Sequence, residues 1–471
     1  MREQKLFIDG TWRAAAETTQ VVDRWSGEPI GVVHRASAAD AKDAVDAAEA
    51  ALRRGFPVHQ RAEVLERTAA YIAAHAEEFA AMITAEVGKP ITASRTEVSR
   101  AVGTLGFAAE EARRLPSETV PMDATEGGVG MIGFTIAQPR GIVAAITPFN
   151  FPVNLVIHKI GPAIAAGCPV VLKPSDRTKL TAGLLTEAFE AAGIPAGYLN
   201  LVTGTPAEVV TTWQEDPRVA VVTFTGSSKV GWQLKAAAPQ KMHVLELGSN
   251  TAMVVAADAD VERAATDTIT AALSNSGQAC VSLQRVYVEA AAADQYLHLV
   301  AEKFAAVPTG DPNLDTTLVG PLVADAEVER ISSWLEEATQ RGAKILAGGT
   351  VEGSVLAPTL VADAAQVDRI VCEEVFGPVV SVVTVPDVDS AIAQVNDSKY
   401  GLNTAIYTAS LATAMRYARD AQAGSVLVNV PPSFRADHMP YGGVKDSGQG
   451  REGVKYAVEE MTEQKLVVLK A

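Results

Sequence analysis

The stretch that decides the fold is GIVAAITPFNFPVNLVIHKIGPAIAAGCPVVLKPSD, residues 141–176. A short apolar run at 141–146 is followed by a helical pattern at 153–166 and by a second apolar run at 169–172. Short apolar runs that alternate with helices are typical of a parallel sheet covered by helices on both faces. The stretch therefore predicts consecutive strand, helix and strand of an α/β fold.

The same alternation continues through the first half of the chain. Gly193-Ile194-Pro195 should end one of the helices, as a glycine followed by a proline does. Ligands bind beyond the carboxyl ends of the strands in such sheets. Further strands are expected at 199–202, 220–224 and 244–247, and helices at 38–54, 59–87, 91–114, 180–192, 206–214 and 228–237, after a hairpin at 6–12.

A second α/β unit is predicted between residues 253 and 430, with Cys280 near its start. It too alternates between apolar strand patterns and helical patterns. The strands are expected at 252–256, 285–288, 379–383, 404–407 and 425–430, and the helices at 261–273, 292–305, 324–341, 388–396 and 409–420.

Two strand-like segments, 119–138 and 459–471, fit neither unit. Exposed strands of this kind seek a partner chain, so we interpret them as an oligomerisation element of a homodimer or homotetramer. The alternative is an edge strand and a frayed tail. The expected domains are a dinucleotide-binding domain (1–118 and 139–247), a catalytic domain (248–445), a return segment (446–458) and the oligomerisation element (119–138 and 459–471).

Composition limits the classes of function. A chain of 471 residues is too long for one core, and its 48% hydrophobic and 20% charged content describes a soluble protein. The net charge of −16 argues against a nucleic-acid or anionic-membrane surface. No apolar stretch has the length of a membrane span or a signal peptide. Three cysteines far apart favour reduced thiols in the cytoplasm, and no spacing predicts a metal site.

Two glycine-containing motifs are candidates for a nucleotide-binding site. Residues 448–453 match GxGxxG, but a loop rather than a strand precedes them, so we reject them as a dinucleotide fingerprint. The segment FTGSSKVG, 224–231, follows an apolar strand and opens a helix, which turns backbone amides toward an anion. Glycine and serine there can equally serve only as a turn and a helix cap.

Cys280 is the candidate nucleophile. It follows Asn275-Ser276-Gly277-Gln278-Ala279, just past a helical pattern, where exposed backbone amides can help a thiol to ionise and attack a carbonyl. The alternative is a buried structural cysteine.

Three further positions follow predicted strands. Asn150 lies between two prolines and can donate to a developing oxyanion, or form an Asx turn that caps the next helix. Lys173 and Asp176 can hold ribose hydroxyls, or form a solvated helix start. Glu246 lies in an otherwise apolar strand, where burial should raise its pKa toward that of a general base; otherwise it is a solvated strand-end carboxylate.

These pieces together resemble the aldehyde dehydrogenase superfamily along nearly the whole chain. They are ITPFNFP, LKPSD, FTGSSKVG, LELGSN, NSGQAC, EEVFGPV (373–379) and MPYGGVKDSGQGREG (439–453), in the order and spacing of that family. The resemblance implies a Rossmann-like cofactor domain, an α/β catalytic domain and a bridging β element that builds dimers or tetramers.

The resemblance also implies a mechanism and its residues. Cys280 would attack an aldehyde, Asn150 and the Cys280 N–H would hold the oxyanion, hydride would leave for a nicotinamide, and Glu246 would activate water to hydrolyse the thioester. The presence of Glu246 counts against a coenzyme-A-acylating enzyme. The implied cofactor-binding residues are Thr147, Pro148, Phe149, Lys173, Ser175, Asp176, Gly226, Ser227, Gly248, Glu374 and Phe376.

Three departures from the family pattern bear on specificity. Ser249 stands where a second glycine is common and narrows the room near the cofactor. Asp176 replaces a glutamate common in NAD-preferring relatives; it keeps the carboxylate that repels a 2′-phosphate, so we favour NAD over NADP although Arg177 and Lys179 are near. Ala279 stands where relatives acting on phosphorylated or phosphonate aldehydes often carry arginine.

Arg100, His158 and Arg435 resemble a branch that acts on small polar or anionic aldehydes, including lactaldehyde, phosphonoacetaldehyde and sulfolactaldehyde dehydrogenases. Cationic side chains in a pocket that excludes water would select a substrate with an anionic end. The alternative is that these three residues only stabilise the fold. The expected function is oxidation of a short polar or anionic aldehyde. The alternatives are a broad-range aliphatic aldehyde dehydrogenase, a non-catalytic binding or structural protein, and an esterase that uses the same thiol.

Overall fold

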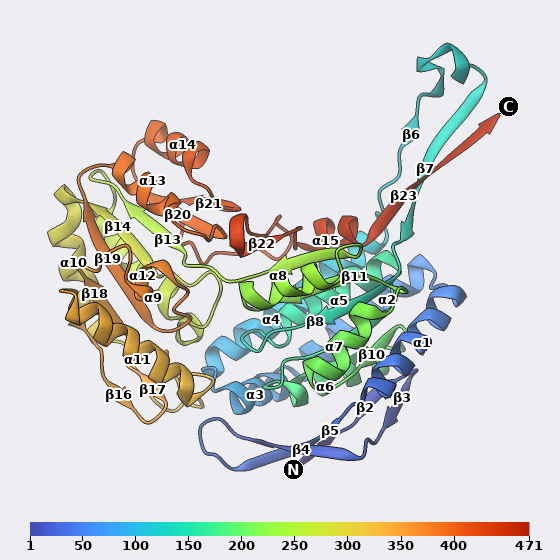
Figure 1. Cartoon of the computed structure of the whole chain (residues 1–471), viewed down its shortest axis with the longest axis horizontal. Helices are drawn as coiled ribbons and strands as arrows, with labels where there is room; N and C mark the ends of the chain where they lie inside the picture. Colours follow the sequence, from blue (N-terminus) through green and yellow to red (C-terminus); the bar gives the residue numbers. More distant parts are fainter. Residues whose placement is uncertain (471) are drawn as a thin grey trace.

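A computed structural model describes residues 1–470 and contains two mostly parallel sheets with helices packed around them, and a ribbon that projects from the body (Figure 1). The α/β prediction is confirmed, because the five apolar runs of the first half form the parallel strands β8 to β12. In spatial order the first sheet contains β22 (Gly448–Gln449), β12 (Met242–Glu246), β11 (Val219–Thr225), β8 (Ile142–Ile146), β9 (Val170–Lys173), β10 (Leu199–Leu201), β2 (Leu6–Ile8) and β3 (Thr11–Arg13).

Helices cover both faces of this sheet. Alternate residues of β8 explain why: Val143 and Ala145 belong to one buried core, and Ala144 belongs to the core on the opposite face. One face is covered by α1 (Ala38–Arg54), α7 (Pro206–Glu215) and α8 (Ser228–Ala237), and the other by α2 (Val58–Ala74), α3 (Ala76–Val87), α4 (Ile91–Ala112), α5 (Asn154–Ala166) and α6 (Lys179–Ala191). As predicted, α6 ends just before Gly193, which has φ +83°.

The strand order places a switch point between β8 and β11. From β8 the chain proceeds through β9 to β10 on one side, and then returns to build β11 and β12 on the other. Loops that leave the carboxyl ends of β8 and β11 therefore diverge and open a crevice, which is where open α/β sheets bind ligands.

The second sheet carries the second half of the chain. Its strands are β15 (Lys344–Ala347), β18 (Thr359–Ala362), β19 (Val379–Val385), β14 (Arg285–Glu289), β13 (Ala252–Val255), β20 (Asn403–Tyr407) and β21 (Ser425–Val428) in spatial order, all parallel except β15. The associated helices are α9 (Val261–Leu273), α10 (Ala290–Ala305), α11 (Asp325–Gln340), α12 (Arg369–Cys372), α13 (Val388–Asn396) and α14 (Leu411–Asp420).

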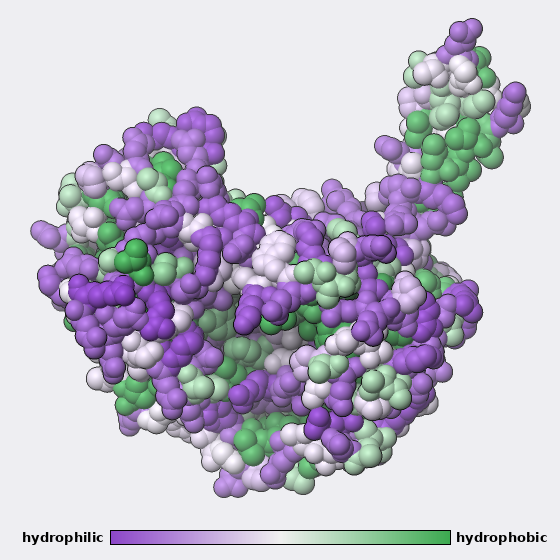
Figure 2. Space-filling model, viewed as in Figure 1, coloured by the Kyte–Doolittle hydropathy of each residue, from purple (hydrophilic) through white to green (hydrophobic). Residues whose placement is uncertain are grey.

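The segments 119–138 and 459–471, which fitted neither α/β unit, pair with each other through their described residues and form the projecting ribbon. Strand β23 (Thr462–Lys470) runs antiparallel along the whole of β7 (Met131–Pro139), which also pairs with β6 (Thr119–Val120). Figure 2 shows apolar residues gathered on this ribbon. One face carries directly opposed apolar pairs, and its Ile132 and Leu469 are 54% and 51% exposed.

The elements predicted from the sequence differ from the structure in two ways. The single helix expected over 59–87 is divided into α2 and α3 at His75, whose Nδ1 lies 2.8 Å from the Tyr71 carbonyl oxygen and whose backbone leaves the helical region. Several strands were not predicted, because most of them have only two to four residues and cannot show alternation. These are β1 (Arg2–Gln4), β4 (Glu17–Val22), β5 (Pro29–Arg35), β15, β16 (Val351–Glu352), β17 (Val355–Leu356), β18 and β22. The longer β4 is mostly polar, and a proline and a glycine interrupt the pattern of β5.

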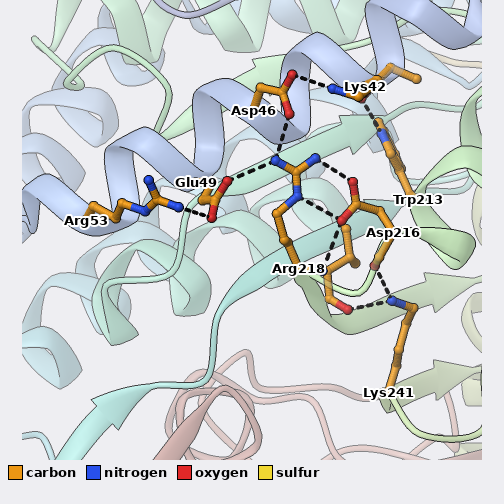
Figure 3. Close-up of polar contacts among 10 residues, drawn as sticks. Lys42, Asp46, Glu49, Arg53, Trp213, Asp216, Arg218 and Lys241 are labelled. Atoms are coloured by element: carbon orange, nitrogen blue, oxygen red, sulfur yellow. Dashed lines mark hydrogen bonds and ion pairs between the residues drawn. The ribbon is translucent and has the colours of Figure 1, made fainter.

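A polar cluster around Arg218 fixes the entry to β11 (Figure 3). The guanidinium pairs with Asp216 at 2.6 Å, and with Asp46 and Glu49 of α1 at 2.7 and 2.9 Å. Lys241 adds hydrogen bonds to the carbonyl oxygens of Asp216 and Val219. The cluster therefore joins α1 to the start of a strand whose far end reaches the crevice.

Within residues 1–470, no helix combines the length and the apolar character needed to cross a membrane.

Candidate active site

A cavity of about 460 Å³ occupies the crevice at the switch point. Its walls come from the loops after β8, β9, β11 and β12, from α7 and α8, and from loop residues of the second α/β unit. The structure brings together in these walls Cys280, Glu246, Asn150 and all of the cofactor candidates: Thr147, Pro148, Phe149, Lys173, Ser175, Asp176, Gly226, Ser227, Gly248, Glu374 and Phe376.

The half of the cavity beside α8 suits a dinucleotide. Ser227 caps α8 by accepting a hydrogen bond from the Val230 N–H, so the first turn of the helix directs its amides at the cavity. Val210 and Leu234 add apolar wall that an adenine ring could contact. The sequence did not reveal these two residues, because ordinary helix positions carry no motif.

Glu374 and Phe376 line the opposite wall of the cavity. Glu374 accepts a hydrogen bond from the Ser249 N–H at 2.9 Å, and burial raises the pKa of Glu374 to about 7. A side chain at Gly248 would meet the Glu374 carboxylate at 2.6 Å, so glycine keeps this passage open. The rings of Phe376 and Phe149 pack edge to face, with their centres 5.9 Å apart.

Lys173 and Asp176 contact each other. The buried Lys173 Nζ donates to the Pro174 carbonyl at 3.0 Å and to Asp176 at 3.3 Å, and burial lowers the pKa of Lys173. Lys179 lies 3.5 Å from the same carboxylate. The buried Lys173 is not part of a solvated helix start, and two lysines offset the charge of Asp176.

A strained loop presents Cys280. Asn275, Ser276 and Gly277 have φ of +53°, +55° and +73°, three consecutive residues in the left-handed region. A side chain at Gly277 would meet the Gly377 carbonyl oxygen at 2.2 Å. The Ser276 hydroxyl is fixed by the Gly320 N–H at 3.0 Å. Packing against other segments therefore holds a turn that the local sequence does not favour.

The Cys280 residue is half-buried. Its sulfur lies 3.1 Å from the hydroxyl of Tyr441, which sequence reasoning missed although the residue stands in the quoted motif 439–453. Burial raises the pKa of the Cys280 thiol to about 11, and the carboxylates of Glu246 and Glu374 add to this effect. The environment of the sulfur therefore disfavours the thiolate, and ionisation of Cys280 needs stabilising contacts besides the neighbouring amides.

Asn150 is placed to serve as an oxyanion donor. Its Nδ2 donates to the Gln278 carbonyl at 3.0 Å, which leaves one N–H for another acceptor. The Asx-turn alternative fails, because α5 has no side-chain cap at Val153. Within residues 1–470, the N–H of Cys280 also donates to no acceptor. Asn150 Nδ2 and the Cys280 backbone N–H therefore each keep a hydrogen for a further acceptor.

Glu246 ends β12 and is 3% exposed, so it is not a solvated strand-end carboxylate. Neither carboxylate oxygen has a hydrogen-bond partner among residues 1–470. Burial raises the pKa of Glu246 well above its usual range, and the charge of Glu452 adds to the rise. Gly448 of the rejected GxGxxG motif pairs with Glu246 at the sheet edge and leads to α15 (Val454–Glu460) rather than to a phosphate loop.

A second cavity, of about 350 Å³, lies on the other side of the thiol. Among the described residues, Cys280 alone lines both cavities. Arg100, Ala279, Arg435 and Tyr441 belong to the walls of the second cavity. The sulfur therefore stands where a molecule in one cavity meets a molecule in the other.

The candidate cations of this second cavity already have partners. Arg100 forms two hydrogen bonds with Asp437, at 2.7 and 3.2 Å, and Arg435 pairs with Glu452 at 3.0 Å. His158 is 1% exposed, lines neither cavity and lies 2.9 Å from Asp437. The structure thus places His158 behind Asp437 rather than in the substrate wall, where the sequence had suggested it.

Buried ion pairs support these residues and were not predicted. Lys159 of α5 bonds Glu452 at 2.8 Å and Thr223 at 3.1 Å, and Lys89 bonds Glu97 at 2.7 Å. Within residues 1–470, no group of three or more His, Cys, Asp or Glu side chains is arranged to hold a metal ion.

Comparison with known proteins gives consistent relatives. Residues 12–467 match the profile of the "Aldehyde dehydrogenase family". The chain is 41% identical to a 3-sulfolactaldehyde dehydrogenase of Priestia megaterium, covering all of this chain and 98% of that protein. It is 36% identical to a lactaldehyde dehydrogenase of Methanococcus maripaludis, covering 98% and 99%. The NADP complex of a glyceraldehyde-3-phosphate dehydrogenase from Bacillus halodurans superposes with a TM-score of 0.97 at 32% identity, covering 99% of each chain.

Proposed function

Because the chain belongs to the aldehyde dehydrogenase family, an enzyme class that oxidises aldehydes, we propose that it converts a short polar or anionic aldehyde into its carboxylic acid with Cys280 as the nucleophile. The observation that carries the proposal is the position of Cys280 between the two cavities, with Asn150 and Glu246 in the wall of the first. A nucleophile, an oxyanion donor and a buried base are the groups that this reaction needs.

The chemistry follows from these positions. After the Cys280 thiol has lost its proton to solvent, the thiolate bonds to the carbonyl carbon, and the oxygen becomes an oxyanion that accepts from Asn150 Nδ2 and the Cys280 N–H. The dinucleotide, when bound along α8 and Glu374, supplies the hydride acceptor. Loss of hydride from the substrate carbon leaves a thioester on Cys280. Glu246 then takes a proton from water as the water oxygen attacks the thioester. The C–S bond breaks, the carboxylic acid leaves, and the proton passes from Glu246 to the sulfur, which restores the thiol.

Either nicotinamide dinucleotide is consistent with the family and with this cavity, and we propose NAD as the preferred one. The support is the Asp176 carboxylate, which would repel a 2′-phosphate. Lys173 and Lys179 weaken this repulsion, so the preference should be modest. Comparing kcat/KM for NAD and NADP tests it, and Asp176→Ala should shift the ratio toward NADP.

The substrate proposal rests on the second cavity and on the relatives. The two relatives are named for sulfolactaldehyde and lactaldehyde, which are short and polar. Arg100 and Arg435 bring guanidinium groups to the wall, but each is shared with a carboxylate. A substrate anion would therefore meet a partly neutralised cation.

The experiment is an NADH-absorbance assay with propanal, lactaldehyde, succinic semialdehyde and sulfolactaldehyde, each with NAD and with NADP. Arg100→Ala should raise KM for the anionic aldehydes far more than for propanal. An equal effect on both would remove Arg100 from substrate selection. A wild-type chain inactive on the whole panel would favour the binding-protein alternative, and ester hydrolysis that needs no dinucleotide would favour the esterase.

We also propose that the chain forms homo-oligomers through the ribbon and works in the cytoplasm, with the domain limits given by its sequence pattern. The support for assembly is the exposed apolar face of β7 and β23, since a thin ribbon with such a face is marginally stable alone. The support for the cytoplasm is three free thiols.

A further inference from the structure

Tyr441 presents its hydroxyl to the reacting sulfur. The Oη–Sγ distance to Cys280 is 3.1 Å, and within residues 1–470 the hydroxyl has no other partner. The side chain is 1% exposed and lines the second cavity beside Cys280. This contact is unexplained by the fold, because a phenylalanine ring would fill the same space.

The ring of Tyr441 is held from two directions. Its backbone exchanges two hydrogen bonds with Glu452, at 3.0 and 2.7 Å. The Arg435 guanidinium lies over the ring, 3.7 Å from its centre, and is itself anchored by Glu452. The hydroxyl is therefore fixed before any substrate arrives, as preorganised stabilisation of charge requires.

We propose that the Tyr441 hydroxyl donates its hydrogen bond to the Cys280 sulfur and stabilises the thiolate that attacks the aldehyde. The inference rests on the proposed role of Cys280. Once the sulfur is ionised it can only accept, so the phenol is the donor. Burial and the charges of Cys280 and Glu246 raise the pKa of Tyr441 well above its usual range, which keeps the phenol protonated.

The hydrogen bond from Tyr441 offsets an environment that otherwise disfavours the Cys280 thiolate. The charged groups that face the sulfur are Glu246 and Glu374, which disfavour the thiolate, and Arg435, which favours it. A hydrogen bond to a charged group is worth roughly one to two pKa units. Removing it should lower the thiolate fraction without moving the sulfur.

The test measures iodoacetamide labelling of Cys280 at pH 8, without coenzyme, by peptide mass spectrometry. Tyr441→Phe should react about 3- to 15-fold more slowly than wild type, since the loss of thiolate exceeds the gain in nucleophilicity of a more basic sulfur. The matched control is Tyr296→Phe in α10, which deletes another buried hydroxyl; that hydroxyl lies 2.7 Å from the hydroxyl of Thr268 in α9. Labelling of Cys372 in the same sample is the internal reference.

A second variant keeps the shape of the side chain. Fluorotyrosine at position 441 is a stronger donor and should make labelling faster than in wild type. This variant decides the matter if Tyr441→Phe does not fold. Unchanged or faster labelling in Tyr441→Phe, or unchanged labelling with fluorotyrosine, would overturn the proposal. A Cys280→Ser variant that still oxidises aldehydes would overturn the proposed function instead, which separates the two failures.

Discussion

At the residue scale, two groups divide the work around one sulfur. In the proposed mechanism, Asn150 stabilises charge on oxygen while Cys280 attacks, and Glu246 acts only when the thioester must be hydrolysed. Asn150→Ala should lower kcat about 10²- to 10³-fold, as the loss of one oxyanion donor does elsewhere. Steady-state kinetics measures this, with circular dichroism as the control for folding. A decrease below about threefold would mean that Asn150 does not contact the oxyanion.

The pH dependence of hydrolysis belongs to Glu246. Its carboxylate must be ionised to accept a proton, and its pKa is raised well above 4.5. Hydrolysis of the acyl-enzyme should therefore increase as pH rises through this elevated pKa and then level off. Single-turnover kinetics of the acylated protein can follow it. Glu246→Gln should remove the increase and slow hydrolysis about 10²- to 10⁴-fold; the same pH profile in the variant would assign the base to another group.

At the element scale, strands and the loops after them set the geometry. The Arg218 cluster (Figure 3) fixes the start of β11. The far end of the strand reaches Thr225 in the cavity wall. Arg218→Ala should destabilise the fold by about 1–2 kcal/mol, since the network is partly open to solvent. Thermal unfolding measures this, and KM for the dinucleotide should change less than twofold. An unchanged Tm would show that the network is energetically neutral.

The features that could be predicted from the sequence are those set by residues close together in the chain. The strands β8 to β12 were found because apolar runs and helix stops are local patterns. The candidates Cys280, Glu246 and Asn150 meet in one cavity wall, and each could be chosen from local context: Cys280 follows a helix, Asn150 follows a strand between two prolines, and Glu246 interrupts an apolar strand. Tyr441 and the buried pair of Lys159 with Glu452 were missed, because their partners lie at least 161 positions away in the chain. The position of His158 was misjudged for the same reason: only the fold places it behind Asp437.

At the scale of the whole molecule, the ribbon is the feature that the folded chain leaves uncovered. Leu469→Lys places a charge on its apolar face and should shift the oligomer toward smaller species at micromolar concentration, measured by light scattering after size exclusion. Leu411→Lys, which charges an exposed leucine of α14 outside the ribbon, is the matched control and should assemble as wild type. Assembly unaffected by Leu469→Lys would assign the interface to another surface.

The two cavities and the sulfur between them make up one reaction centre, and this is the central claim. The most direct measurement is intact-protein and peptide mass spectrometry of Glu246→Gln mixed with lactaldehyde and NAD. The account predicts one equivalent of NADH and one acyl group on Cys280 per chain. An acyl group on Cys168 or Cys372, or a stoichiometric burst with Cys280 unmodified, would contradict it.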